Sequence, residues 1–174
     1  MLAERPEDAL YGYAEVTLDK AGRFVVPVEF FERLKGREPM RMLVDPQGRC
    51  LELRTETRFN ELVARLARLA PSLPPETVSV MMGEYLGYSI QVQIDNAYRL
   101  TIPKKFRELL DGEELVLLGI GEALQIWSRA AFRAAQKERR ALLARECPRL
   151  MHALLGVEPA AKEVAPPDGA PAEA

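Results

Sequence analysis

The chain carries the same sequence unit twice. Residues 12–34 read GYAEVTLDKAGRFVVPVEFFERL and residues 88–110 read YSIQVQIDNAYRLTIPKKFRELL, so each residue of the second copy lies 76 positions after its counterpart. The identical pairs at this offset include Asp19 and Asp95, Arg23 and Arg99, Pro27 and Pro103, Phe30 and Phe106, and Leu34 and Leu110. A further match follows at an offset of 73, where LELR at 51–54 aligns with LQIW at 124–127. The repeat predicts one structural unit built twice.

Each copy predicts the same order of elements. Residues 14–18 and 90–94 alternate between apolar and polar, as half-buried strands do. A turn, a second short strand and a proline that suits the first position of a helix come next. The expected helices are 28–34 and 104–110, and the further strands are 41–44, 50–53, 115–118 and 123–127. The fold class predicted from this order is α+β, mainly β.

A longer helix closes each copy. The apolar residues from 59 to 70 have helical spacing, and Thr55 is a suitable N-cap. The proline-rich segment 71–75 ends that helix and predicts a linker. In the second copy Ser128 caps a helix that runs to about Glu146 and stops before Pro148. From residue 158 onward the chain is rich in Ala, Pro and Glu, which predicts disorder.

The most informative feature of each copy is its Asp-x-x-x-Arg turn. An Asp side chain accepts hydrogen bonds from backbone N–H groups two residues ahead and so fixes a turn. The arginine that follows, Arg23 or Arg99, then projects from a defined place, and its planar fork of donors suits guanine O6 and N7 or a phosphate. Two such turns would present two forks on one surface. The alternative is an ordinary hairpin turn with a local ion pair of little energetic weight.

The charge distribution permits nucleic-acid binding. The whole chain has a formal charge of −2, but residues 1–10 carry −2 and residues 158–174 carry −3, which leaves +3 for the part between them. Lysines and arginines near the turns could hold phosphates. These candidates are Lys20, Lys104, Lys105 and Arg107.

The composition argues against an enzyme or a metalloprotein. His152 is the only histidine, and the two cysteines, Cys50 and Cys147, are too few and too far apart for a disulfide framework or a closed zinc site. We find no catalytic constellation and no glycine-rich phosphate loop, and we expect no cofactor and no metal. The sequence has no apolar run long enough for a membrane span and no secretory signal, so a reducing cytoplasm is expected.

Several motifs resemble one known family. The segment LDKAGRFVVP at 18–27, the tandem repeat at this spacing, and LVLLGIG at 115–121 followed by IWS at 126–128 are similar to the MraZ family of the AbrB-like (SpoVT-AbrB) superfamily. The resemblance covers residues 11–143. It implies two AbrB-like repeats, 11–75 and 76–157, that together form a swapped-hairpin β-barrel pseudo-dimer with flanking helices, followed by the tail 158–174.

The resemblance also implies a function. Members of the family assemble into rings, bind short direct repeats in double-stranded DNA upstream of division and cell-wall genes, and repress those genes. The arginine with which the family contacts DNA falls on Arg23 in one copy and Arg99 in the other. The residues expected to shape the turns are Asp19, Gly22, Asp95 and Asn96.

The second turn departs from the pattern. The first turn has Gly22, which readily adopts a positive φ angle, whereas the second has Tyr98 at that position. We expect Asn96 to take the left-handed conformation instead, which would give the second turn another shape. Residues 79–86 are also less basic and less aromatic than the family pattern. The expected function is a sequence-specific, cytoplasmic and nucleoid-associated transcriptional repressor. The alternative is an oligomeric interaction protein in which DNA binding is weak or lost.

Overall fold

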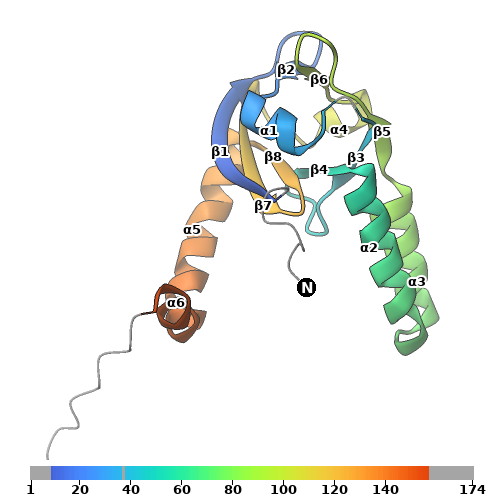
Figure 1. Cartoon of the computed structure of the whole chain (residues 1–174), viewed down its shortest axis with the longest axis vertical. Helices are drawn as coiled ribbons and strands as arrows, with labels where there is room; N and C mark the ends of the chain where they lie inside the picture. The colour runs from blue at the N-terminus through green and yellow to red at the C-terminus, as the bar shows by residue number, and fades with distance from the viewer. Residues whose placement is uncertain (1–8, 37, 157–174) are drawn as a thin grey trace, which may run out of the picture. The chain divides into compact units, whose positions relative to one another are not determined.

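The computed structural model describes residues 9–36 and 38–156 of the chain (Figure 1). It divides into two compact units, Met1–Ala135 and Gln136–Ala174. The first unit contains all the strands and both Asp-x-x-x-Arg turns. The tail expected to be disordered, residues 158–174, lies outside the described residues. The predicted class, α+β and mainly β, is confirmed.

The strands form one six-stranded and one two-stranded sheet. The larger sheet is antiparallel with the order β1-β7-β8-β4-β3-β5, and the smaller pairs β2 with β6. The bounds are β1 Leu10–Thr17, β2 Arg23–Val25, β3 Met40–Val44, β4 Leu51–Thr55, β5 Ile90–Val92, β6 Arg99–Thr101, β7 Glu114–Gly121 and β8 Leu124–Ser128. The larger sheet is open, with β1 and β5 as its edge strands.

The pairing exchanges strands between the two copies. Strand β1 of the first copy pairs with β7 of the second, and β5 of the second pairs with β3 of the first. The two short strands β2 and β6 pair with each other, as do β4 and β8. Each copy therefore completes the other, and neither forms its sheet alone.

Helices cover parts of the sheets and follow the local sequence signals. Thr55 caps α2 by accepting the N–H of Arg58 at 3.2 Å, and Ser128 accepts the N–H of Ala131 at 3.3 Å at the start of α5. These two caps agree with the sequence. The helices are α1 Val28–Arg33, α2 Glu56–Leu69, η2 Ala70–Ser72, α3 Pro75–Val80, η3 Met81–Gly87, α4 Lys104–Arg107, α5 Arg129–Glu146 and α6 Pro148–Leu155.

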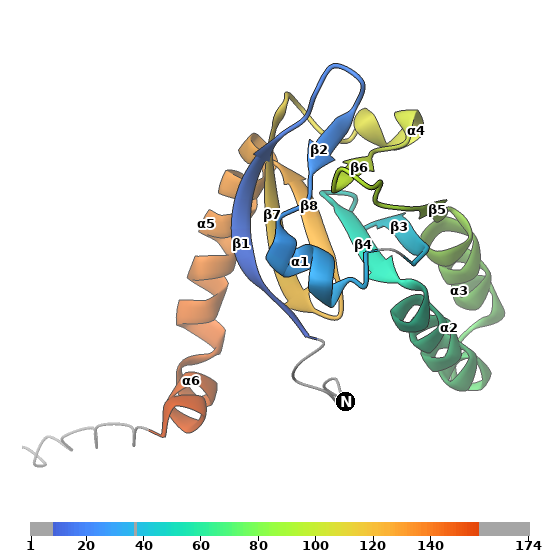
Figure 2. The same cartoon turned by 45° about the horizontal axis from the view of Figure 1, so that its top comes forward.

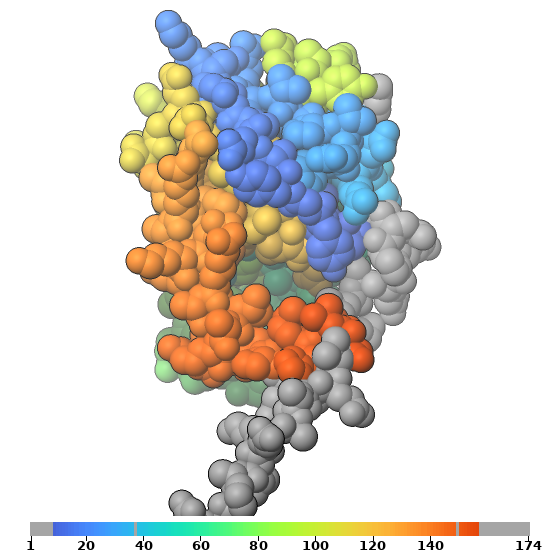
Figure 3. All heavy atoms as spheres, turned by 90° about the vertical axis from the view of Figure 1, so that its left-hand side faces the viewer, coloured from blue at the N-terminus to red at the C-terminus, as the bar shows by residue number. Residues whose placement is uncertain are grey.

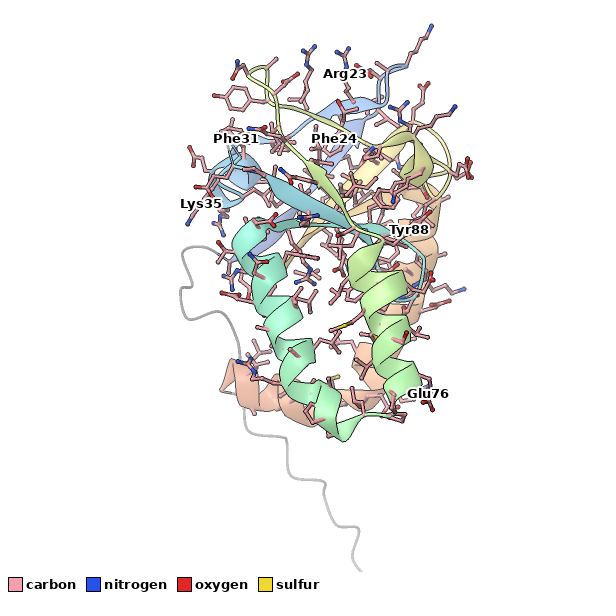
Figure 4. The ribbon with its side chains drawn as sticks, turned by 90° about the vertical axis from the view of Figure 1, so that its right-hand side faces the viewer. Arg23, Phe24, Phe31, Lys35, Glu76 and Tyr88 are labelled. Carbon is pink, nitrogen blue, oxygen red and sulfur yellow. The ribbon has the colours of Figure 1, made fainter. Side chains whose placement is uncertain are left out.

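The segment between the copies differs from the expected linker. Residues 70–72 form the short 3₁₀ helix η2, and Pro75 begins α3 instead of extending a loop. Proline fits there because the first helical residue needs no N–H partner. Helix α3 continues into the π-helix η3, so that α2 and α3 lie side by side (Figures 1 and 4). The sequence reasoning assigned no helix to residues 75–87.

The main core lies between the two copies. Phe30 and Phe106 are counterparts in α1 and α4, and both are almost fully buried, as are Leu34, Leu100 and Ile102. Burying one such side chain stabilises the fold by about 1.5–3 kcal/mol. Two smaller clusters lie elsewhere, one around Trp127 and Phe132 and the other joining Leu43 to Leu66 and Leu86. Of the described residues, no helix is both long and apolar enough to cross a bilayer.

Candidate nucleic-acid interface

The first turn is held by one carboxylate. Oδ1 of Asp19 accepts the backbone N–H groups of Ala21 and Arg23, each at 2.9 Å. Oδ2 accepts Nε of Arg23 at 2.9 Å and pairs with its Nη2 at 2.9 Å. Gly22 donates its N–H to the carbonyl oxygen of Asp19 at 2.8 Å and has a φ of 79°. Hydrogen bonding from the Arg23 backbone, more than any other contact, holds the pKa of Asp19 below its ordinary value.

The second turn has the same hydrogen bonds. Oδ1 of Asp95 accepts the N–H of Ala97 at 2.8 Å and that of Arg99 at 2.9 Å. Its Oδ2 accepts Nε of Arg99 at 2.9 Å and pairs with Nη2 at 2.9 Å. Backbone hydrogen bonding from Arg99 is again the main cause that lowers the pKa of the aspartate. The two turns therefore place their arginines in the same way.

The expectation about Asn96 is wrong. Tyr98 takes the left-handed conformation, with a φ of 60°, and Asn96 does not. The N–H of Tyr98 donates to the carbonyl oxygen of Asp95 at 3.0 Å, as that of Gly22 does to Asp19 in the first turn. The turn keeps its shape because Asp95 makes the same hydrogen bonds whatever the side chain at position 98. A bulky residue with positive φ carries a strain of about 1–2 kcal/mol.

The fold brings the two turns to one end of the sheet structure. Arg23 pairs with Thr101 and Val25 with Arg99 in the β2–β6 ladder. Helices α1 and α4 lie on either side of this ladder (Figure 2). The hydrogen bonds that continue the pairing run from Ile102 N–H to the Gly22 carbonyl oxygen at 2.8 Å and from Val26 N–H to the Tyr98 carbonyl oxygen at 2.7 Å. The two arginines thus project from adjacent strands.

Each arginine is half-buried, and its aspartate binds one edge of its guanidinium group. The exposed fractions of the Arg23 and Arg99 side chains are 36% and 38%. The aspartates engage the edge of the guanidinium that carries Nε and Nη2, so the edge with Nη1 faces away from them. Figure 4 shows Arg23 near the end of the molecule where the turns lie. Such an arrangement preorganises the guanidinium for an acceptor outside the protein.

The remaining candidate cations do not all reach the turns. Lys20 is exposed in the first turn. Arg107 lies directly over the same turn, because a Cβ placed on Gly22 would be 2.0 Å from its Cζ, and its Nε donates to the Ile102 carbonyl oxygen at 2.7 Å. Lys104 is exposed at the start of α4. The Nζ of Lys105 lies 3.8 Å from the centre of the Tyr88 ring and donates to its carbonyl oxygen at 3.2 Å, so Lys105 is engaged beside β5.

The sequence reasoning noted Tyr98 in the second turn but missed Phe31 and the packing of the two rings. Phe31 and Tyr98 stand at the positions that correspond to Arg107 and Gly22, and their rings pack edge to face with centres 4.7 Å apart. They line an open hollow of about 230 Å³ together with Gln93, Ile94, Asp95 and Asn96. Applying the offset of 76 to the short helix as well as to the turn would have found this pair.

A buried charged cluster lies away from the turns. Arg54 donates to Glu52 at 2.8 Å through Nη2, and the two side chains are only 7% and 6% exposed. Tyr85 of η3 donates to the same Glu52 oxygen at 3.1 Å, and burial is the main cause that raises its pKa to about 12. Arg65 pairs with Glu122 at 2.7 Å, and Arg54 lies 3.5 Å from that carboxylate. All four charges have partners, so the cluster is a packing feature of α2 and η3 on the sheet.

The described residues include no group suited to hold a metal ion. In residues 9–36 and 38–156, no group of three His, Cys, Asp or Glu side chains is placed to hold a metal ion. Cys50 is buried and Cys147 is half-buried. The turn surface is therefore the site to compare with known proteins.

Comparison with known proteins points to one family. The family model described as "MraZ protein" matches residues 9–78 and 86–150. The chain is 31% identical to the transcriptional regulator MraZ of Thiobacillus denitrificans over 128 residues, which cover 71% of this chain and 83% of that protein. It is 24% identical to the transcriptional regulator MraZ of Coxiella burnetii over 141 residues, which cover 79% of this chain and 90% of that protein. It is 26% identical to the transcriptional regulator MraZ of Saccharophagus degradans over 129 residues, which cover 71% of this chain and 85% of that protein. The match spans both copies of the repeat, and the chain belongs to the MraZ family.

Proposed function

We propose that this chain is a transcriptional regulator that binds double-stranded DNA with the surface formed by its two Asp-x-x-x-Arg turns. The observation that carries the proposal is the pair of turns with the same hydrogen bonds, held on adjacent strands of the β2–β6 ladder. The naming of its relatives as transcriptional regulators supports the same role. No catalytic step is part of this function.

The chemistry of the turns suits DNA. An aspartate that holds one edge of a guanidinium leaves the other edge to donate to guanine O6 and N7 or to a phosphate. Asp19 and Asp95 are ionised at neutral pH, and the hydrogen bonds of the turns lower their pKa values further, so the carboxylates keep the arginines in place. The same carboxylates cancel part of the positive charge. One chain would therefore bind DNA weakly, and several chains bound together would bind it well.

The strand exchange supports the proposed fold of the DNA-binding part. Each copy lends its first strand to the other, which is the arrangement expected of a swapped-hairpin pseudo-dimer with a barrel-like core. We assign the halves to residues 11–75 and 76–157. This division places one turn and one short helix in each half.

A ring of several chains is part of the proposal. Strand β1, blue in the space-filling view of Figure 3, is an edge strand. Its Tyr11 and Tyr13 are 61% and 50% exposed, and Tyr11 lies opposite Ile120 of β7, which is 41% exposed. Exposed apolar residues on an edge strand favour contact with another protein surface. A ring would align many turns with short direct repeats at a promoter. Bound there, in the nucleoid, the regulator would repress division and cell-wall genes.

One observation favours a second candidate function. The whole chain is acidic, with a formal charge of −2. An oligomeric interaction protein with this fold, in which DNA binding is weak or lost, would need no basic surface. Such a protein would still assemble but would not bind DNA.

A binding series on duplexes with one, two and three copies of a direct repeat tests the proposal. Arg23→Ala and Arg99→Ala should each weaken binding about tenfold, because each removes one fork of donors, and the double variant should bind least. Arg68→Ala on α2 is the matched control, since it removes one exposed charge away from the turns. Light scattering follows assembly. Unchanged binding by the double variant would overturn the proposed site, and assembly without DNA binding by the unaltered chain would favour the second candidate.

A further inference from the structure

The two turns have the same backbone but opposite surroundings. At the offset of 76, Lys20 corresponds to Asn96, Gly22 to Tyr98, and Arg107 to Phe31. Each turn is covered by the short helix of the other copy: Arg107 of α4 lies over the first turn, and Phe31 of α1 packs on the second. The differences therefore cluster at the two arginines proposed to contact DNA.

The surroundings of the first turn are cationic. Gly22 is buried beneath the guanidinium of Arg107, which is fixed by its 2.7 Å hydrogen bond to the Ile102 carbonyl oxygen. Three cations at the first turn, Lys20, Arg23 and Arg107, face the single carboxylate of Asp19. These four side chains carry a formal charge of +2. Helix α4 adds the exposed Lys104 at its start. Fixed cations of this kind are suited to phosphates, which carry no sequence information.

The surroundings of the second turn are aromatic and have no excess of cations. Asp95 and Arg99 cancel each other, and Asn96 replaces the lysine of the first turn. The Tyr98 side chain is 40% exposed, with its ring packed on Phe31 at the edge of the open hollow. The helix beside this turn begins with Val28 and Glu29, where the other begins with two lysines. Amide and aromatic groups are suited to base edges, through adenine N6 and N7 and the thymine methyl group.

The position of Tyr98 strengthens this interpretation. The backbone there has a φ of 60°, where a glycine would be free of strain, as Gly22 is at 79° in the first turn. The ring is only partly covered by Phe31, so packing within the protein uses part of its surface and leaves the rest facing solvent beside Arg99. The side chain thus stands beside the proposed DNA contact and not in the core.

We propose that the two turns divide the work of DNA recognition: Lys20, Arg23 and Arg107 hold the DNA backbone, and Asn96 and Tyr98 beside Arg99 discriminate between sequences. This inference rests on the proposed DNA-binding function. It also gives the surface a direction. A surface with two equal halves matches a palindrome, whereas unlike halves match a site that reads differently in its two directions. One chain therefore takes one orientation on DNA, as direct repeats require.

Selection from a duplex library with a randomised centre provides the probe. The unaltered chain is used to enrich a duplex, and binding to that duplex and to its shuffled version is measured over a range of salt concentrations. Arg107→Ala should reduce the slope of log affinity against log salt by about one, and lower affinity for both duplexes alike. Tyr98→Gly should leave the slope unchanged and lower the preference for the selected duplex about tenfold. Glycine suits the positive φ at position 98, so this variant keeps the turn.

Two further variants test the hydroxyl group of Tyr98 and the residue that covers the second turn. Tyr98→Phe keeps the ring on Phe31 and should retain most of the preference if the ring contacts a thymine methyl group. The double variant Phe31→Arg with Tyr98→Gly gives the second turn the glycine and the covering arginine of the first, and it should steepen the salt slope and lower the preference. A cleaving reagent attached to a cysteine in place of the exposed Ala21 of the first turn reports the orientation of the protein on a duplex labelled at one end, and cleavage at one side of the site is expected.

The outcomes distinguish this inference from the function on which it rests. If the unaltered chain enriches no duplex and binds none, the proposed function fails. If it binds a selected duplex and Tyr98→Gly keeps the full preference, or if cleavage occurs equally at both sides of the site, the division of work between the turns is overturned. Loss of preference with an unchanged salt slope supports it.

Discussion

The outer faces of β4 and β8 occupy equivalent places in the two repeats and have opposite chemistry. Glu52 of β4 lies opposite Gln125 of β8 in the ladder that joins the copies. On β4, Arg54 donates to Glu52 at 2.8 Å. On β8, the indole Nε1 of Trp127 donates to the Gln125 side-chain oxygen at 3.1 Å. The hydrogen bond between residues i and i+2 is thus preserved while its charges are removed.

The difference follows from what covers each strand. The face of β8 is covered by the first turns of α5, where Phe132 and Ala135 pack on Trp127. The face of β4 lies under α2 and η3, which bring Tyr85 to Glu52 and Arg65 to Glu122. A buried ion pair is tolerated only when its partners are complete, since each charge loses its hydration. The second repeat stabilises the same backbone with an apolar cluster.

The largest expected effect concerns the apolar face. Trp127→Ala should lower the free energy of unfolding by about 3–5 kcal/mol, because it removes a fully buried ring and leaves a cavity. Chemical denaturation measures the change. Leu69→Ala, at a side chain 57% exposed, is the control and should change stability by less than about 0.5 kcal/mol. Equal losses from the two variants would contradict the account of the β8 face.

The charged face should respond in a different pattern. Arg54→Ala leaves Glu52 buried without its main partner and should cost about 3 kcal/mol. Changing both residues, as Glu52→Gln with Arg54→Met, removes the charges together and should cost less than the single variant. Denaturation of both variants tests this order. A double variant less stable than the single one would show that the ion pair itself stabilises the fold.

A smaller effect is expected where the repeats share their backbone. Gly22→Ala places a Cβ at a φ of 79° and against the Arg107 guanidinium, so it should cost about 1–2 kcal/mol. In the second turn Tyr98→Gly relieves the strain of positive φ and loses only the contact with Phe31, so its stability change should be under about 1 kcal/mol. Thermal unfolding compares the two. A larger loss from Tyr98→Gly than from Gly22→Ala would show that the ring, not the backbone, holds the second turn.

An effect confined to alkaline pH concerns the phenol in the charged cluster. Burial raises the pKa of Tyr85 from 10.0 to about 12, so the folded state favours the neutral phenol. Its contribution to stability is complete below pH 10.0 and is lost as the pH rises toward 12. Tyr85→Phe should lack this loss, so its unfolding free energy should fall less steeply with pH in that range. Parallel pH profiles for the two proteins would indicate that Tyr85 is not buried against Glu52.

Much of the local structure could be predicted from the sequence. The repeat, the order of strands and helices, the caps at Thr55 and Ser128, and the role of the aspartate in each turn all depend on contacts between residues close in the chain. The same local reasoning failed at Tyr98, because it assigned the positive φ by residue preference. The hydrogen bonds that Asp95 accepts from Ala97, Tyr98 and Arg99 outweigh that preference.

The candidate site was predictable only in part, because some of its contacts join the two repeats. Arg23 and Arg99 follow from the turn motif, and the structure places them on paired strands. Phe31 and Arg107 belong to helices that cover the turn of the other repeat, and Lys105 is engaged by Tyr88. No spacing within one copy indicates these contacts. The helical pairing of residues 56–87 was also missed, because prolines 74 and 75 are consistent with both a linker and a helix start.

The sequence by itself determined that this protein is one unit used twice, with an aspartate-held arginine in each copy, because repeats and turns are read from neighbouring residues. Only the tertiary structure decided that each copy lends a strand to the other, that β4 is charged where β8 is apolar, and that a cation lies over one turn and an aromatic ring over the other. These features join residues far apart in the chain, and their energies depend on burial and charge partners that exist only after folding.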